Sequence, residues 1–272
     1  MPPSEERQGK LDEGAHAFYL RMLALIADAR IPFVVGGAYA LRHYTGIERH
    51  TKDFDVFVRR EHYGDVERAL GAAGVATELT FPHWLGKASC EDGSIDVIFS
   101  SGNGLSQVDD AWFEHAIVGS VLGVELRICP PEEMIWSKAF VTERERYDGA
   151  DIMHLLLARA ERLDWQRLLG RFDAHWRVLL SYLGLFGFVY PSERDRIPEW
   201  VMSDLIGRLS RELRTPPSPR RICQGTLLSR EQYLTDVGVW GFEDARLTVT
   251  NSMTVEEVAH WTRAIGDSAE SD

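Results

Sequence analysis

Hydrophobic and polar positions alternate with two different periods over the first 130 residues of the chain. In residues 12–29 the apolar side chains, among them Phe18 and Ile26, recur at helical spacing, and Pro32 ends this predicted helix. Residues 33–35 then form a short apolar run, which predicts a strand that leads into a double glycine and a second helix.

A period of two is clearest after residue 52. Apolar side chains there alternate with others in the order Asp53, Phe54, Asp55, Val56, Phe57, Val58. This alternation predicts a strand with one buried face. By the same criteria a helix is predicted at residues 61–73, and further strands at residues 75–79, 84–90, 94–99 and 121–129.

The pattern becomes mainly helical after Pro130 and Pro131. The predicted helices cover residues 132–142, 148–162, 165–172 and 175–187. A cluster of prolines at residues 215–219 predicts a linker, and Thr254 with Glu257 predicts a capping box that opens a last helix.

These elements predict an α+β fold in three parts. We expect a catalytic core, a mixed sheet with flanking helices, in residues 1–130. A helical domain is expected in residues 131–213, and a C-terminal segment without an assigned role in residues 214–272.

The composition is that of a globular protein, since 44% of the 272 residues are hydrophobic and 26% are charged. The longest apolar stretch, residues 178–190, is shorter than the about 20 residues that a membrane-spanning helix requires. The first ten residues are polar or charged where a signal peptide would be apolar. We therefore expect a cytoplasmic protein without a membrane partner.

The charge balance of 30 basic against 42 acidic residues gives a net charge of −12, which disfavours nonspecific binding to a nucleic-acid backbone. The one basic run, in residues 208–221, is the candidate for a local nucleic-acid contact, although its pattern is more typical of a solvated helix end and loop. Three distant cysteines and nine scattered histidines predict neither disulfides nor a zinc site.

Three aspartates form the first half of a candidate site. Asp53 and Asp55 lie two apart on one predicted strand and therefore point to the same face, and Asp96 lies on a later strand. If the two strands are neighbours, each pair of carboxylates about 5 Å apart costs roughly 3 kcal/mol at an effective dielectric near 20. A divalent cation offsets this repulsion, and magnesium is the usual ion where carboxylates meet phosphates. Taken singly, the first two also fit a solvated edge strand, and Asp96 fits the turn at residues 92–93.

Gly36 and Gly37 form the second half. They lie where a predicted strand turns into a helix, and helix N-terminal N–H groups without obstructing side chains bind phosphate oxygens. An ordinary tight turn explains the pair alone, and the chain has no P-loop motif. Together with the aspartates, the glycines favour a nucleoside triphosphate as ligand.

The segment VVGGAYALRHYTGIERHTKDFDVFV, followed by SIDVIF, resembles the DNA polymerase beta-type nucleotidyltransferase superfamily. Within it, the chain is similar to the small bacterial toxin-like and abortive-infection nucleotidyltransferases. The matching residues, all within residues 31–100, are Gly36, Gly37, Ala40, Leu41, Thr51, Asp53, Asp55 and Asp96.

This resemblance implies a core of polymerase beta type in which the glycine turn and Thr51 hold a nucleoside triphosphate such as ATP. It also implies two Mg²⁺ ions, with Mn²⁺ as the alternative, bound by the three aspartates. Asp53 and Asp55 would bind the metal that orients the triphosphate, and Asp96 would hold or deprotonate the acceptor hydroxyl. The implied reaction is in-line displacement at the α-phosphorus with pyrophosphate leaving.

A second likeness to the toxin-like group covers Lys138, Asp148 and Asp151. It implies that Lys138 is catalytic and contacts the phosphates, and that Asp151 belongs to the nucleotide-binding residues and fixes this lysine. An exposed lysine and an aspartate favoured by the helix macrodipole explain the same residues equally well.

We therefore expect an enzyme that transfers a nucleoside monophosphate to a small hydroxylated molecule, a protein side chain or an RNA end. The alternative is a non-catalytic nucleotide-binding or partner-binding protein that keeps the fold. Because all three aspartates are retained, the enzyme is favoured. A toxin with an antitoxin partner is compatible with such catalysis.

Overall fold

The computed structural model describes residues 13–49, 51, 53–91, 93–248, 251 and 253–269. The chain divides into two compact units. The first comprises Met1–Ser101 and Gln107–Pro130, and the second comprises Gly102–Ser106 and Pro131–Asp272. The three-domain division and its boundaries stay a prediction.

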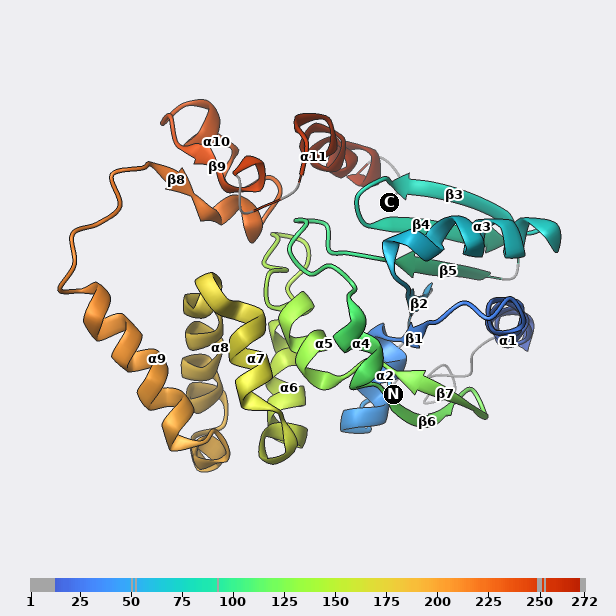
Figure 1. Ribbon diagram of the computed structural model, residues 1–272, viewed down its shortest axis with the longest axis horizontal. Helices are drawn as coiled ribbons and strands as arrows, with labels where there is room; N and C mark the ends of the chain where they lie inside the picture. The colour runs from blue at the N-terminus through green and yellow to red at the C-terminus, as the bar shows by residue number, and fades with distance from the viewer. Residues whose placement is uncertain are drawn as a thin grey trace, which may run out of the picture. The chain divides into compact units, whose positions relative to one another are not determined.

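The first unit is built on a mixed seven-stranded sheet in the order β3-β4-β5-β2-β1-β7-β6 (Figure 1). The strands are β1 (Val34–Val35), β2 (Asp53–Phe57), β3 (Ala76–Phe81), β4 (Leu85–Cys90), β5 (Gly93–Ile98), β6 (Ile117–Val121) and β7 (Val124–Ile128). β2 pairs with β5, and β1 with β7, in parallel, while the other neighbours are antiparallel. The predicted mixed sheet with flanking helices is confirmed.

One predicted strand is wrong, because residues 121–129 are not a single strand. β6 and β7 form a hairpin, and Leu122 and Gly123 at its tip both have positive φ, of 54° and 82°. Two such residues are typical of a two-residue hairpin turn. The sequence lacks the Asn-Gly or Asp-Gly pair that is typical of this turn. The turn was therefore not predicted, and the end of β6 and the whole of β7 were predicted as one strand.

Two helices, α1 (Glu13–Asp28) and α3 (Tyr63–Ala72), pack against one face of this sheet. The face consists of fully buried side chains such as Phe54, Val56 and Ile95. The ring of Tyr19 in α1 lies 5.2 Å from that of Phe54. The apolar half of each alternating strand is therefore covered by helices, as burial of apolar surface requires.

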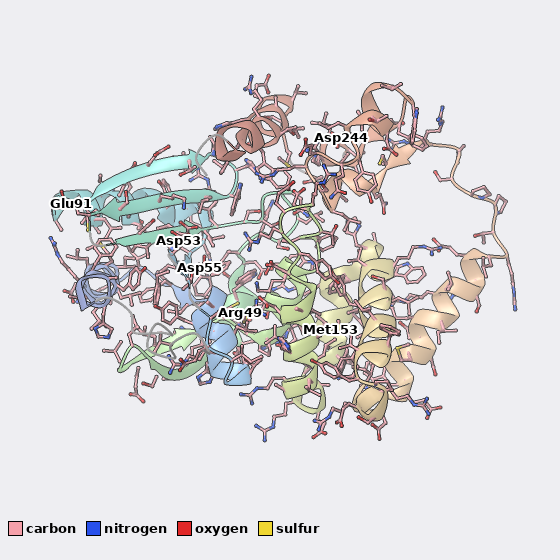
Figure 2. The ribbon with its side chains drawn as sticks, turned by 180° about the vertical axis from the view of Figure 1, so that it is seen from behind. Arg49, Asp53, Asp55, Glu91, Met153 and Asp244 are labelled. Carbon is pink, nitrogen blue, oxygen red and sulfur yellow. The ribbon has the colours of Figure 1, made fainter. Side chains whose placement is uncertain are left out.

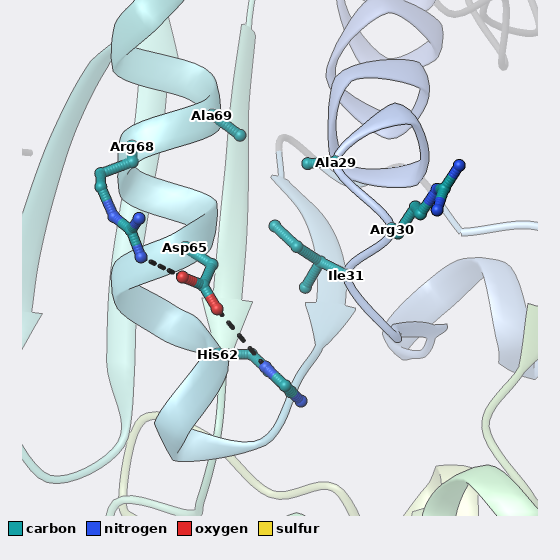
Figure 3. Close-up of a pocket in the computed structure, with 7 residues that line it drawn as sticks. All are labelled: Ala29, Arg30, Ile31, His62, Asp65, Arg68 and Ala69. Carbon is teal, nitrogen blue, oxygen red and sulfur yellow. Dashed lines mark hydrogen bonds and ion pairs between the residues drawn. The ribbon is translucent and has the colours of Figure 1, made fainter.

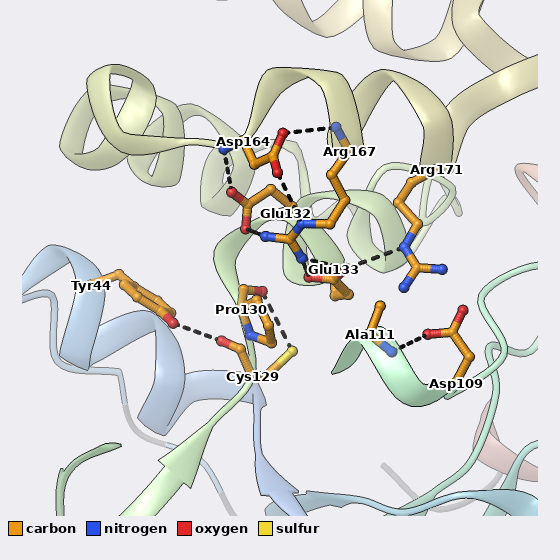
Figure 4. A network of polar contacts seen from close by, with 10 residues as sticks. All are labelled: Tyr44, Asp109, Ala111, Cys129, Pro130, Glu132, Glu133, Asp164, Arg167 and Arg171. Carbon is orange, nitrogen blue, oxygen red and sulfur yellow. Dashed lines mark hydrogen bonds and ion pairs between the residues drawn. The ribbon is translucent and has the colours of Figure 1, made fainter. Parts of the chain in front are cut away.

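Two further helices belong to the first unit. α2 (Gly37–Thr45) begins directly after β1, and the hydroxyl of Tyr44 near its end donates to the carbonyl oxygen of Cys129 at 2.9 Å (Figure 4). The short α4 (Asp110–Glu114) was not predicted. Its fully buried Trp112 stacks on Phe57, with ring centroids 4.9 Å apart, and so covers the far end of the face opposite α1 and α3.

The second unit is mostly helical, as predicted for the chain after residue 130. Its longer helices are α5 (Pro131–Lys138), α6 (Gly149–Arg159), α7 (Trp165–Phe172), α8 (Trp176–Val189), α9 (Glu199–Glu212) and α11 (Val255–Ala269). α9 was not predicted. Its short helical turns are η3 (Ala160–Arg162), η4 (Asp173–His175), η5 (Pro191–Arg196), η6 (Gln224–Leu227), η7 (Ala245–Leu247) and α10 (Leu234–Gly238), while η2 (Arg60–His62) belongs to the first unit.

The C-terminal segment contains a two-stranded parallel sheet of β8 (Ile222–Cys223) and β9 (Glu243–Asp244). The predicted capping box is confirmed at the start of α11. The N–H of Glu257 donates to Thr254 Oγ1 at 3.2 Å, and the N–H of Thr254 donates to Glu257 Oε2 at 2.8 Å. Among the residues that the structure describes, no helix is both long and apolar enough to span a membrane.

A buried network of charges joins α5 to α7 within the second unit (Figure 4). Glu133 is fully buried, and both of its carboxylate oxygens accept from Arg167 Nη1, at 2.7 and 2.6 Å. Arg171 Nε donates to the same carboxylate at 3.2 Å, and Arg167 also pairs with Glu132 at 2.6 Å. Buried charges of this kind are tolerated only when each is paired.

Candidate functional site

Asp55 and Asp96 are register partners on the neighbouring parallel strands β2 and β5. Side chains of register partners point to the same face of a sheet, and Asp53, two residues before Asp55, shares that face (Figure 2). The three predicted aspartates therefore lie on one face. β2 and β5 both have neighbours on each side, so these residues do not belong to a solvated edge strand.

This acidic face, defined by Asp53, Asp55 and Asp96, is opposite the face that α1 and α3 cover. Phe54, between Asp53 and Asp55, and Ile95, directly before Asp96, point to that opposite face and are fully buried. The side chain of Asp53 is 43% exposed and that of Asp96 is 15% exposed. The acidic face is thus open to solvent at Asp53 and more enclosed at Asp96.

The glycine turn lies directly against Asp55. Gly37 has φ of 55°, which disfavours any residue with a side chain, and a Cβ atom there would overlap Asp55 Oδ2. A Cβ atom on Gly36 would in turn overlap the ring of Phe57. Both glycines are therefore required by close approach to β2.

The two glycines differ in what their N–H groups do. The N–H of Gly36 donates to the carbonyl oxygen of Asp55 at 3.1 Å and so continues the sheet. Gly37 is the first residue of α2, and the first N–H groups of a helix have no acceptor within that helix. A phosphate would consequently meet the amides that begin at Gly37, beside the carboxylate of Asp55.

Thr51 holds the start of β2. Its hydroxyl donates to the carbonyl oxygen of Asp53 at 2.9 Å and accepts from the N–H of the same residue at 3.3 Å. Thr51 was predicted as a nucleotide-binding residue. In this structure its hydroxyl fixes the backbone of Asp53.

A lysine that the sequence analysis did not select completes this face. Lys87 on β4 is the register partner of Asp96. Its Nζ lies 2.9 Å from Asp96 Oδ1 and 4.0 Å from Asp53 Oδ1. The only available signal was that Lys87 is the one charged residue in the predicted strand at residues 84–90.

The electrostatic surroundings shift the pKa of two neighbouring groups. Burial lowers the pKa of Lys87, but the hydrogen bond to Asp96 and the negative charges of Asp96, Asp53 and Asp55 outweigh it, so the pKa lies above its ordinary value. Burial raises the pKa of Tyr19, and the same aspartates raise it further. The lysine is therefore charged and the tyrosine neutral at pH 7.

The donor set of the acidic face suits a hard divalent cation. Among the residues described by the structure, no three acidic, histidine or cysteine side chains are gathered closely enough to hold a metal ion by themselves. Magnesium usually takes one or two carboxylates and completes its shell with water and substrate phosphates. Asp53 and Asp55, beside the amides of α2, provide such a partial site.

The remaining predicted residues, Lys138 and Asp151, lie in the second unit. Lys138 Nζ is 2.8 Å from Asp151 Oδ2 and 2.9 Å from Asp148 Oδ2, and all three side chains are largely buried. The lysine is thus paired with Asp151 and is not an exposed surface residue. That it contacts phosphates stays a prediction.

A pocket of about 510 Å³ in the first unit contains none of the predicted site residues (Figure 3). Its lining comes from the segment directly after α1, the last residue of η2 and the middle of α3: Ala29, Arg30, Ile31, His62, Asp65, Arg68 and Ala69. Asp65 pairs there with Arg68 and, at 3.6 Å, with His62. This pocket is separate from the acidic face.

No family model matches the chain, and no curated protein is significantly similar to it in sequence. The chain is similar to several solved structures. The antibiotic-resistance factor ANT(2'')-Ia is 19% identical, with 60% of this chain and 94% of that chain covered and a TM-score of 0.42. The lincosamide antibiotic adenylyltransferase LnuA, in its lincomycin-bound form, is 16% identical over 54% of this chain and 98% of that chain, with a TM-score of 0.35.

A third similar structure is an antigenic nucleotidyltransferase-like protein from Paracoccidioides brasiliensis. It is 13% identical, with 68% of this chain and 92% of that chain covered and a TM-score of 0.41. Nucleotidyltransferases are thus among the structures that this chain is similar to, as the sequence motif predicted.

Proposed function

We propose that this protein is a metal-dependent nucleotidyltransferase, which moves a nucleoside monophosphate from a nucleoside triphosphate to an acceptor hydroxyl and releases pyrophosphate. The observation that carries this proposal is the register of Asp55 with Asp96, with Gly37 against Asp55. Two carboxylates on adjacent central strands and a side-chain-free helix start beside them provide sites for a cation and a phosphate at one place.

The triphosphate is bound first by the backbone of the glycine turn. Amides at the start of α2 donate to phosphate oxygens, and the positive end of the helix dipole favours their negative charge. Asp53 and Asp55 would hold the Mg²⁺ ion that accompanies the triphosphate. When bound, the metal polarises the phosphoryl oxygens and stabilises the charge that develops on the leaving pyrophosphate.

Asp96 acts on the acceptor. Its carboxylate accepts the proton of the acceptor hydroxyl as the acceptor oxygen forms a bond to the α-phosphorus. The bond from the α-phosphorus to the bridging oxygen of the β-phosphate breaks, and the electron pair leaves with pyrophosphate. Thr51 keeps Asp53 in place during this step through its two hydrogen bonds to the backbone of β2.

Lys138 and Asp151 are proposed as a phosphate-binding lysine and its positioning residue. The support for this role is that Lys138 is enclosed and held by two carboxylates, at 2.8 and 2.9 Å, as a lysine with a fixed direction would be. Substitution of Lys138 by Met should then raise KM for the triphosphate more than it lowers kcat.

The test is an incubation of the protein with each of the four α-labelled ribonucleoside triphosphates, Mg²⁺ and a cell extract. We expect pyrophosphate release and a labelled product with the wild-type protein. Asp53→Asn and Asp55→Asn should each lower the rate by about a hundredfold or more. Asp65→Asn is the matched control, since the side chains of Asp65 and Asp53 are both 43% exposed and Asp65 lies on α3.

The alternative, a non-catalytic nucleotide-binding or partner-binding protein, makes a different prediction. In that case wild type and Asp53→Asn release the same background of pyrophosphate, although both bind a triphosphate or a partner protein. Fractionation of the labelled product into small molecules, protein and RNA identifies the acceptor class. Toxicity on expression that Asp55→Asn relieves would identify a toxin with an antitoxin partner.

A further inference from the structure

Lys87 brings a permanent positive charge onto the acidic face. Its ammonium group bridges Asp96 at 2.9 Å and Asp53 at 4.0 Å, on the same side of the sheet as Asp55. An ammonium ion here contacts the carboxylates that would otherwise hold a second metal ion.

The position of Lys87 is fixed by the sheet. β4 pairs with β5 over its whole length, from Leu85 opposite Ile98 to Cys90 opposite Gly93. The backbone of Lys87 therefore cannot move away from Asp96 without breaking the ladder between two interior strands. The lysine side chain is 36% exposed, so it is partly enclosed.

The charge balance of the site follows from this position. Three carboxylates, one ammonium group and one divalent cation are neutral together. In the absence of a nucleotide, a second divalent cation would leave an excess of positive charge on this partly buried face, which would repel both the added ion and Lys87.

We propose that Lys87 supplies the second cation of this site, so that the acidic face binds one divalent ion through Asp53 and Asp55 while Lys87 neutralises Asp96. This inference rests on the proposed nucleotidyl transfer, because it concerns the metal site of that reaction. For the protein without a bound triphosphate, it revises the expectation of two Mg²⁺ ions to one. Lys87 is in this view a positioning residue that orients Asp96 towards the acceptor.

The experiment counts Mn²⁺ ions bound per chain by electron paramagnetic resonance, with Mn²⁺ alone as the probe. We expect one ion in the wild-type protein. Lys87→Met should gain a second ion or bind Mn²⁺ at least about tenfold more tightly, because a unit positive charge 4.0 Å from the carboxylate of Asp53 is removed. Lys87→Arg, which keeps the charge, should bind one ion.

Arg68→Met is the matched control, since it removes one positive charge from an exposed position on α3 without touching the acidic face. It should bind Mn²⁺ like the wild type. The proposal is overturned if Lys87→Met and wild type bind the same number of ions with the same affinity. It is also overturned if the wild-type protein or Lys87→Arg binds two.

Misfolding of Lys87→Met does not leave the proposal untested, because Lys87→Arg and the wild type each give an independent count. Far-ultraviolet circular dichroism identifies a misfolded variant, and Lys87→Gln then replaces it. Failure of the proposed function is separate from failure of this inference. A wild-type protein without pyrophosphate release can still gain a Mn²⁺ site in Lys87→Met, and an active enzyme can fail to do so.

Discussion

Asp55 Oδ2 occupies the space where the side chain of residue 37 would begin, and only the glycine at that position allows the contact. Gly37 also has φ of 55°, a conformation that other L-residues rarely adopt. The contact between Gly37 and Asp55 therefore requires both the glycine at the start of α2 and the position of the Asp55 side chain on β2.

The substitution Gly37→Ala tests this relationship. The strain of a positive φ alone costs about 1–2 kcal/mol, and the overlap with Asp55 displaces the carboxylate that would bind the metal. We expect lower stability in urea denaturation and loss of pyrophosphate release. Gly71→Ala is the control, because a Cβ atom on Gly71 in α3 meets nothing within 4 Å. That control should change stability by no more than about 1 kcal/mol, in the stabilising direction; equal behaviour of the two variants would contradict the close approach.

Thr51 provides a test of positioning. Thr51→Val removes both hydrogen bonds to Asp53 while keeping the shape of the side chain, whereas Thr51→Ser keeps the hydroxyl. Misplacement of Asp53 should lower kcat by about tenfold to a hundredfold in Thr51→Val, with Thr51→Ser close to wild type. If Thr51 instead binds the nucleotide directly, KM for the triphosphate rises and kcat is unchanged.

The buried charge network of the second unit predicts a large stability effect. Glu133 is 0% exposed and accepts from Arg167 and Arg171. Glu133→Gln leaves these two arginines without their carboxylate, and removal of one partner from a buried pair costs about 3–5 kcal/mol. Urea denaturation measures this loss. The exposed pair of Glu161 with Arg196 is the comparison, since Glu161→Gln should lower the free energy of unfolding by less than about 1 kcal/mol. Equal losses in the two variants would contradict a stabilising role of the buried network.

Asp148 predicts a pH dependence of stability. Burial raises the pKa of its carboxyl, but Lys138 and Arg146 lower it more, so the pKa in the folded protein lies below its ordinary value of 3.8. The ionised carboxylate therefore stabilises the fold above pH 3.8, and this contribution is lost as the pH falls through the lower folded-state pKa. The stability difference between wild type and Asp148→Asn should be largest near pH 7 and shrink in acid. A stability difference that is the same at all pH values would contradict this account.

The sequence predicted the elements that carry the aspartates because their pattern is local. Alternation over residues 53–58 and the helical spacing in α1 are visible in a window of a few residues. That Asp96 shares a face with Asp55 depended on the pairing of β2 with β5, which local pattern does not reveal. The sequence analysis stated this pairing only as a condition, and the resemblance to a family implied that the three aspartates share one site.

The contact of Lys87 with Asp96 could not be predicted from local pattern. It exists because β4 is the other neighbour of β5, in a register that places Lys87 opposite Asp96. Register is determined by tertiary pairing and not by the seven residues of the predicted strand. The hairpin of β6 and β7 was missed for a related reason, because the turn at Leu122 and Gly123 carries only one glycine as a signal.

The most direct test of the account is a crystal structure of the wild-type protein with Mn²⁺ and a non-hydrolysable nucleoside triphosphate. We predict an anomalous peak bonded to the carboxylates of Asp53 and Asp55 and to phosphate oxygens, with the phosphates against the amides that begin at Gly37. A triphosphate bound elsewhere on the protein, or Mn²⁺ that contacts neither aspartate, would contradict the central claim.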